Sequence, residues 1–186
     1  MNITSDLDYG PLKYLIGNWS GDKGLDIAPE PDGKENNPYY ETIVFTAADD
    51  VTNAEEQVLT AVHYRQIVKR KSNDNIFHDQ TGYWMWDTES QIVMHSIVIP
   101  RGVCVLAGGK HDKDSESQVC IEVGANINDK DWGIIQSPFM QEKACTTGFE
   151  QQVTVSEQRL SYSQTTIVDI YGKVFKHTDT NELSRQ

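Results

Sequence analysis

The sequence predicts an all-β protein: a single antiparallel β-barrel of about ten strands, with a short helical turn near the N-terminus. Two observations lead to this prediction. From residue 39 onward, segments rich in β-branched and aromatic residues alternate with short polar breaks such as KSNDN and DTES. Helical periodicity appears only near the N-terminus and, weakly, in AADDVTNAEEQ. A β-sandwich would give the same pattern, since alternation alone does not separate the two architectures.

We expect one domain across residues 1–186. A chain of 186 residues is long enough for one core, or for one barrel that encloses a cavity. The sequence has no linker rich in Pro, Gly or Ser, no repeat of fixed period and no block of like charge long enough to be a tail.

The first predicted element lies in residues 7–19, LDYGPLKYLIGNW. A Gly-Pro break is followed by a short apolar run, which indicates one or two helical turns that plug an end of the β structure. Trp19 lies between Gly17 and Gly21, an arrangement typical of a strand start at which a large ring covers the core.

Residues 22–38 contain three prolines and five acidic residues, and this composition predicts a long loop. The loop is either a lid over a cavity mouth or a solvated insertion. Strands follow, and residues 57–69 carry apolar and polar side chains on both faces, as the wall of a small barrel would. The closing stretch, residues 160–177 (LSYSQTTIVDIYGKVFKH), is predicted to be one long strand that ends at His177.

Charge and composition exclude several classes of function. The formal net charge of -12 disfavours nucleic acid and anionic membrane surfaces as partners. No apolar run is long enough to span a membrane, and the N-terminus lacks the pattern of a secretory signal, so a cytoplasmic location is expected. Cys104, Cys120 and Cys145 lie in apolar runs and are predicted to be buried, reduced thiols.

The five histidines form no HxH or HExxH pair. His111 lies in a charged turn and is expected to be solvated, and His63 is expected to be an ordinary strand residue. His78 and His95 lie in apolar strands, where each is either a hydrogen-bonded core residue or a ligand.

Nucleophile and phosphate-binding motifs are absent from the sequence, which has no GxSxG elbow, Walker loop or GxGxxG segment. Asp169 and Glu150 lie inside strand patterns and are the carboxylates most worth inspecting. Spacing nominates no acid and base pair.

Three segments, in order along the chain, resemble the nitrobindin family of small haem-binding β-barrels, which are built like lipocalins and fatty-acid-binding proteins. The first is PLKYLIGNWSGDKGLD, residues 11–26, which is similar to the family's opening PLxxLxGxW turn. The second is residues 77–109, with a histidine before a GYW-type strand and a hairpin after it. The third is residues 160–177, where family members carry LSY and a strand that ends in the proximal histidine.

The resemblance implies a haem b cofactor whose ferric iron is ligated by His177. It also implies binding or sensing of NO and related nitrogen species, and isomerisation of peroxynitrite to nitrate as an enzymatic activity of the family. His78 would lie at the haem edge or on its distal side, and His95 would fill the pocket or act as a second ligand. The resemblance places Trp19, Tyr83 and Trp84 among the aromatic residues of the barrel wall.

The sequence departs from the family in four places. Met85 and Trp86 stand where the family tends to have a basic residue, and His95 stands at a position that is usually small and apolar. Residues 26–38 form a longer loop than is typical, and residues 172–176 replace the usual Pro-Leu lead-in to the proximal histidine. An alternative therefore stays open, in which the barrel is a haem-free carrier of a fatty acid or another small hydrophobic ligand. Lys173, Lys176 and Arg101 are the cations nearest the implied site, and a homodimer is neither indicated nor excluded.

Overall fold

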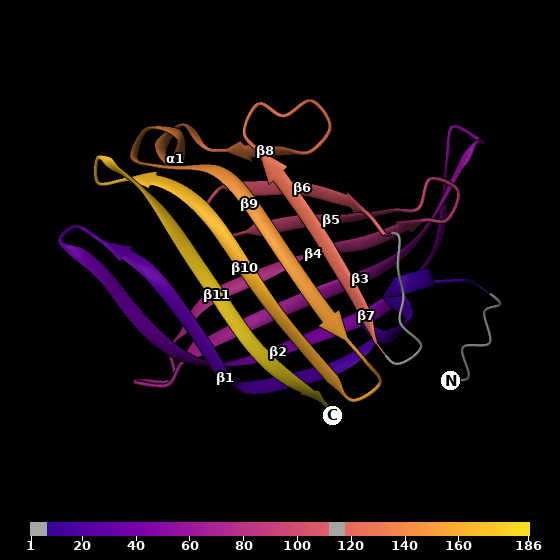
Figure 1. Cartoon of the computed structure of the whole chain (residues 1–186), viewed down its shortest axis with the longest axis horizontal. Helices are drawn as coiled ribbons and strands as arrows, with labels where there is room; N and C mark the ends of the chain where they lie inside the picture. Colours follow the sequence, from indigo (N-terminus) through magenta and orange to yellow (C-terminus); the bar gives the residue numbers. More distant parts are fainter. Residues whose placement is uncertain (1–6, 112–117) are drawn as a thin grey trace.

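The computed structural model describes residues 7–111 and 118–186, which form a closed antiparallel β-barrel (Figure 1). Around the wall the order is β1-β2-β3-β4-β5-β6-β7-β9-β10-β11, and β11 pairs with β1 to close it. The strands are β1 Gly17–Glu30, β2 Gly33–Asn53, β3 Gln57–Arg70, β4 Ile76–Asp87, β5 Ile92–Ile99, β6 Val103–Lys110, β7 Val119–Asn126, β9 Ala144–Val155, β10 Arg159–Ile170 and β11 Lys173–Arg185. The predicted fold class is therefore confirmed.

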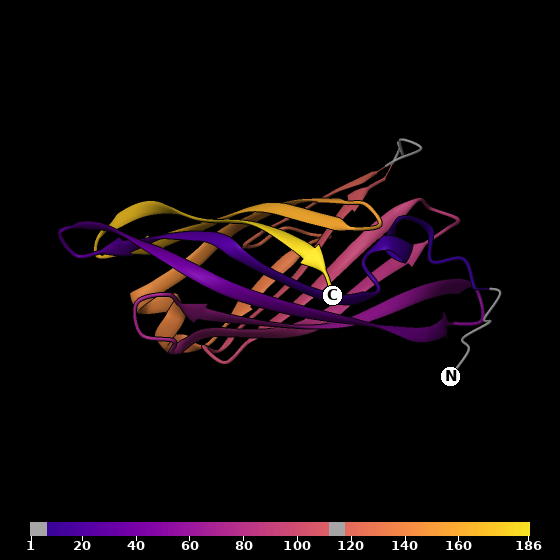
Figure 2. The ribbon, with the colours of Figure 1, turned by 90° about the horizontal axis from the view of Figure 1, so that it is seen from below.

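Three short elements complete the fold of the described residues. The 3-10 turn η1, Gly10–Tyr14, is the predicted N-terminal helical turn. Strand β8, Gly133–Gln136, pairs with β6 along the edge that β7 also contacts, so it extends the wall beside β7. Helix α1, Pro138–Lys143, begins after Ser137, whose hydroxyl accepts a hydrogen bond from the backbone of Met140. Figures 1 and 2 show α1 and the β1–β2 and β10–β11 hairpins at one end of the barrel and η1 at the other.

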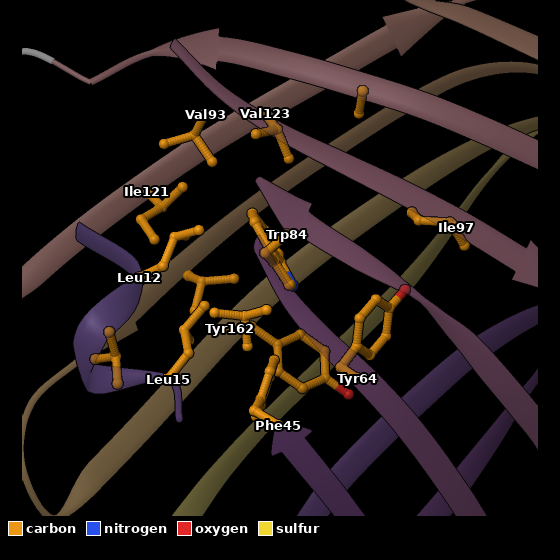
Figure 3. Packing of buried hydrophobic residues seen from close by; sticks show 14 of the residues in the cluster. Leu12, Leu15, Phe45, Tyr64, Trp84, Val93, Ile97, Ile121, Val123 and Tyr162 are labelled. Carbon is orange, nitrogen blue, oxygen red and sulfur yellow. The ribbon is translucent and has the colours of Figure 1, made fainter. Parts of the chain in front are cut away.

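The end near η1 is filled by side chains. Leu12 and Leu15 are completely buried and pack with Phe45, Trp84 and Ile121 inside the barrel (Figure 3). Burying this much apolar surface is the main favourable contribution to folding. The predicted plug is therefore observed, and it leaves the opposite end of the barrel for a site.

The predicted loop at residues 22–38 is wrong, because these residues form the β1–β2 hairpin with a connection of only Pro31 and Asp32. Proline is tolerated in a strand where it has a neighbour on one side only. Pairing of β1 with β11 ends at Ile27, and pairing of β2 with β3 ends at Tyr39. Pro29 and Pro38 therefore lie just beyond the doubly paired region, where the composition of a loop is compatible with a strand.

The predicted single strand at residues 160–177 is also wrong. It is interrupted by a tight turn at Tyr171 and Gly172, with φ angles of 55° and 71°. Two consecutive left-handed residues form the kind of turn that joins twisted antiparallel strands, and the second position favours glycine. His177 therefore lies within β11, paired with Thr166 of β10, and not at the end of a strand.

Two predictions about individual side chains need correction. Cys104 and Cys120 are exposed and Cys145 is partly exposed, because they lie on outward-facing positions of strands whose other face is apolar. His111 is only 8% exposed and packs against the ring of Trp86, although residues 112–117 of its turn lie outside the described part of the chain. Among the described residues no helix is long and apolar enough to cross a membrane.

We expect Leu12→Ala to lower the free energy of unfolding by about 2–5 kcal/mol, because it leaves a cavity in the plugged end. Leu106→Ala is the matched control, since Leu106 is 41% exposed on the outer face of β6. It should change stability by less than about 1 kcal/mol. Urea unfolding curves of the two variants measure both values, and equal losses would contradict the assigned role of η1.

Candidate functional site

A cavity of about 450 Å³ occupies the barrel end opposite η1. Its apolar wall includes Ile97, Val105, Phe149 and Val168, and its rim is formed by α1 and by the β1–β2 and β10–β11 hairpins. Uncharged polar side chains form another part of the lining, among them Tyr39, Gln66, Gln80, Tyr162, Gln164 and Thr166. An apolar slot with a polar wall is the usual form of a small-molecule site.

His177 lines this cavity from β11, between two carboxylates. Its Nε2 atom lies 2.5 Å from Oδ1 of Asp26 and 3.7 Å from Oδ2 of Asp179. Asp26 of β1 is paired directly with Asp179 of β11, and His177 lies two residues before Asp179 on the same strand face. Closure of the barrel therefore brings together three side chains that are up to 153 residues apart in sequence (179 − 26).

The three groups perturb one another. Burial alone would lower the pKa of His177, but the hydrogen bond to Asp26 and the charge of Asp179 outweigh it and raise the pKa. Burial and the neighbouring Asp26 raise the pKa of Asp179 to about 7, despite the opposing effect of His177. Burial by itself would raise the pKa of Asp26, but hydrogen bonds from His177 and Asn37 outweigh it and keep this pKa below the usual value. The arrangement thus attracts positive charge.

His78 also lines the cavity, from the facing wall on β4. Its Nε2 atom lies 3.1 Å from Oε1 of Gln80, whose amide in turn donates to the hydroxyl of Tyr64. Burial lowers the pKa of His78, so the ring is neutral at pH 7. The structure therefore brings His78 and His177 to one cavity.

His95 and Trp84 lie deeper in the barrel, outside the cavity lining. His95 is 1% exposed and stacks on Trp84 with ring centroids 3.8 Å apart, and burial lowers its pKa to about 3. Neither of its ring nitrogens makes a hydrogen bond to the described residues. The void beside the pair is only about 20 Å³, too small for any cofactor, so His95 fills the interior in this structure.

Trp19 and Tyr83 are placed away from the cavity. Trp19 is buried near η1, where its indole nitrogen donates to the carbonyl of Leu15 and the guanidinium of Arg185 covers its ring. Tyr83 is 45% exposed on the outer face of β4 and packs edge-on against His63. Both belong to the barrel wall, and neither touches the space in which a ligand would lie.

Sequence reasoning missed the principal buried carboxylate of the interior, Glu41. It is 2% exposed and accepts hydrogen bonds from Gln66, Asn181 and the hydroxyl of Tyr162, which also bonds to the hydroxyl of Tyr39. Burial raises the pKa of Glu41 to about 7, although these donors oppose the shift.

The carboxylates singled out from the sequence, Asp169 and Glu150, are exposed. One sequence signal could have pointed to the polar residues inside the barrel. His177, Asp179 and Asn181 alternate along β11, and this alternation puts three polar side chains on its inward face.

Cations lie at the cavity rim. Arg70 and Arg101 line the cavity, and Arg101 donates to the backbone carbonyl of Phe77. Lys173 donates to the carbonyl of Pro31 and so joins the β1–β2 and β10–β11 hairpins. Lys176 is exposed at a position that alternates with His177, on the outer face of β11. Of the three cations predicted near the site, only Arg101 reaches the cavity.

The sequence matches the family of THAP4-like, haem-binding β-barrel domains over residues 8–185. The chain belongs to this family. The membership confirms the resemblance that the three sequence segments predict, and it makes this a domain of a haem-binding β-barrel family. The crystal structure of Rv2717c from M. tuberculosis is similar, with 21% identity and a TM-score of 0.69 over 96% of this chain and 99% of that chain. At this identity the likeness shows a shared fold. No curated protein matches the sequence.

The buried carboxylate of Glu41 predicts a stability that falls as the pH rises. Burial raises the pKa of Glu41 to about 7, so the folded protein holds this proton up to about pH 7, whereas the pKa of an unperturbed glutamate is 4.5. The protonated Glu41 thus makes its full contribution to the free energy of unfolding below pH 4.5, and this contribution is lost as the pH rises through 7. Between pH 5 and pH 8, wild type should lose about 2–3 kcal/mol of unfolding free energy relative to Glu41→Gln.

Urea unfolding at the two pH values measures this difference. Glu150→Gln removes an exposed carboxylate from the barrel wall and controls for the loss of one charge. A gap between wild type and Glu41→Gln that stays constant with pH would contradict the assignment.

Proposed function

We propose that this domain binds haem b in the cavity, with His177 as the axial ligand of the iron. The observation that carries the proposal is the position of His177, on the wall of a cavity of about 450 Å³ with a carboxylate holding one ring nitrogen. Histidines that ligate metals usually donate their second ring nitrogen to a carboxylate or carbonyl, which fixes the ring and its tautomer.

The residues that line the cavity fit a haem group. When Nε2 donates to Asp26, the neutral ring carries its lone pair on Nδ1, which makes no hydrogen bond to the residues that the structure describes. The apolar wall around Ile97, Val105 and Phe149 suits the faces of a porphyrin. Arg70 and Arg101 at the rim supply the cations that haem propionates need.

The chemistry proposed for the site is binding of NO and, as a finer proposal, isomerisation of peroxynitrite to nitrate. Bound ferric haem would supply a Lewis-acidic iron centre for such small nitrogen oxides. The chain itself contributes an imidazole oriented by Asp26, a neutral His78 that faces the same space, and apolar walls that exclude water. Gln80 holds the ring of His78 in place.

Titration with hemin should give a Soret band that saturates at one haem per chain. His177→Ala should weaken haem binding by at least about tenfold and change the band, because the axial nitrogen is lost. His63→Ala is the matched control, since His63 lies on the outer face of the barrel and bonds to Thr81. Absorption spectra and hemin affinities of the three proteins measure the effect.

An unchanged spectrum and affinity in His177→Ala would overturn the ligand assignment. Where haem binds, adding NO to the reduced protein and following the Soret band tests gas binding. Stopped-flow decay of peroxynitrite, with and without the loaded protein, tests the isomerase activity separately.

A second function, carriage of a fatty acid without haem, is favoured by one specific observation. Arg70 and Arg101 lie at the rim of a cavity with one apolar wall, an arrangement that suits an anionic head group and an alkyl chain. Displacement of a fluorescent fatty acid measures this function. Displacement by oleate but not by hemin would support the carrier, and the reverse would support the haem protein.

The three cysteines bear on location. All are free and at least partly exposed, and exposed free thiols persist in a reducing compartment such as the cytoplasm. We therefore keep the cytoplasm as the proposed location. A homodimer has no supporting observation in the described residues.

A further inference from the structure

The three side chains around His177 also form a donor set for a metal ion without a porphyrin. One ligand atom from each of Asp26, His177 and Asp179 lies within 4.8 Å of the other two. A nitrogen and two oxygens this close together can ligate one first-row divalent ion after small rotations of the side chains, since such ions bond to nitrogen and oxygen at about 2.0–2.2 Å. The backbone ladder holds Asp26 opposite Asp179, so strand pairing keeps the two carboxylates next to each other.

The surroundings of the cluster favour a cation. The side chains of Asp26 and Asp179 are 4% and 21% exposed, so water screens their mutual repulsion poorly. Two enclosed carboxylates facing each other need a proton or a metal ion between them. No lysine or arginine pairs with either carboxylate within the described part of the chain, and His177 is their ion-pair partner there.

A hydrogen bond from Asn37, which is not one of the three donors, orients Asp26 for binding a metal ion. The amide of Asn37 donates to Oδ2 of Asp26 at 2.8 Å, which leaves Oδ1 directed at His177. Second-shell hydrogen bonds of this kind orient ligating carboxylates in metal sites. The remaining side of the cluster opens into the cavity, which all three residues line. A bound ion would thus keep coordination positions for water or a small ligand.

We propose that Asp26, His177 and Asp179 form a site for one divalent transition-metal ion of the Zn²⁺, Fe²⁺ or Mn²⁺ class. The ion bonds to Nε2 of His177 and to one oxygen of each aspartate, and it replaces the proton held between Nε2 and Asp26. Carboxylate and imidazole donors without thiolate suit these ions better than Cu⁺. The open positions face the cavity, as in catalytic metal centres with three protein ligands.

This site is distinct from haem ligation and does not rest on it. A neutral imidazole has a single lone pair, so His177 bonds to a divalent ion through Nε2 or to haem iron through Nδ1, but not to both. The two occupants therefore compete for one ring. Asp179 belongs only to the divalent site, which makes it the residue that separates the two proposals.

The test uses the full chain, freed of metal and haem, with Zn²⁺ as the probe in calorimetry and Co²⁺ in visible spectroscopy. Wild type should bind one equivalent of Zn²⁺, and Co²⁺ should give d–d bands of a low-coordinate nitrogen and oxygen site. Asp179→Asn should weaken both by at least about tenfold while it retains hemin binding. Asp79→Asn is the matched control, because Asp79 pairs with Arg65 on the outer face.

The outcomes separate the proposals. Failure of wild type to bind Zn²⁺, or an unchanged Zn²⁺ affinity in Asp179→Asn, would overturn the divalent site. Absence of a Soret band with metal binding intact would overturn the haem proposal alone. Circular dichroism of Asp179→Asn checks that it folds, and prior loading with Zn²⁺ should lower the hemin affinity of wild type but not that of Asp179→Asn.

Discussion

Pairing of the first strand with the last is the interaction on which the rest of this structure depends. It closes the barrel, and in its register Asp26 of β1 lies directly opposite Asp179 of β11. Shifting the pairing by one residue would turn one of these carboxylates to the outside, because side chains alternate between the two faces. The cavity wall and the environment of His177 thus follow from one ladder of backbone hydrogen bonds.

The barrel divides stability and function between its two ends. Near η1 the interior is packed with leucine, valine and aromatic side chains, and their burial stabilises the fold. Toward the hairpin end the interior holds Glu41, Asp26 and Asp179, whose burial is unfavourable unless hydrogen bonds or opposite charge compensate it. Glu41 is compensated by Gln66, Tyr162 and Asn181, whereas His177 is the opposite charge beside both aspartates and Asn37 donates to Asp26 alone. Such incompletely compensated charge is typical of sites that bind a ligand.

The ring of His177 links the two chemistries proposed for the cavity. With a proton on Nε2 the ring is anchored to Asp26 and presents Nδ1, as a histidine with a carboxylate partner does in many metal sites. With the proton removed from Nε2, the same atom joins two carboxylate oxygens in a compact donor set. Membership of a haem-binding family favours the state in which Nδ1 is presented to haem. The presence of Asp179 beside Asp26 favours the state in which Nε2 joins the donor set for a divalent ion.

The sequence by itself determined the all-β class and the N-terminal plug, because strand periodicity and the Gly-Pro break are local properties of the chain. Its ordered motifs indicated the family and, through the family, the barrel. It also pointed to His177 and His78. Only the tertiary structure decided that residues 22–38 form a hairpin, that Tyr171 and Gly172 make a turn, and that His95 packs on Trp84. It alone placed Asp26 beside His177, since strand register depends on contacts between residues far apart in sequence, which no local pattern records.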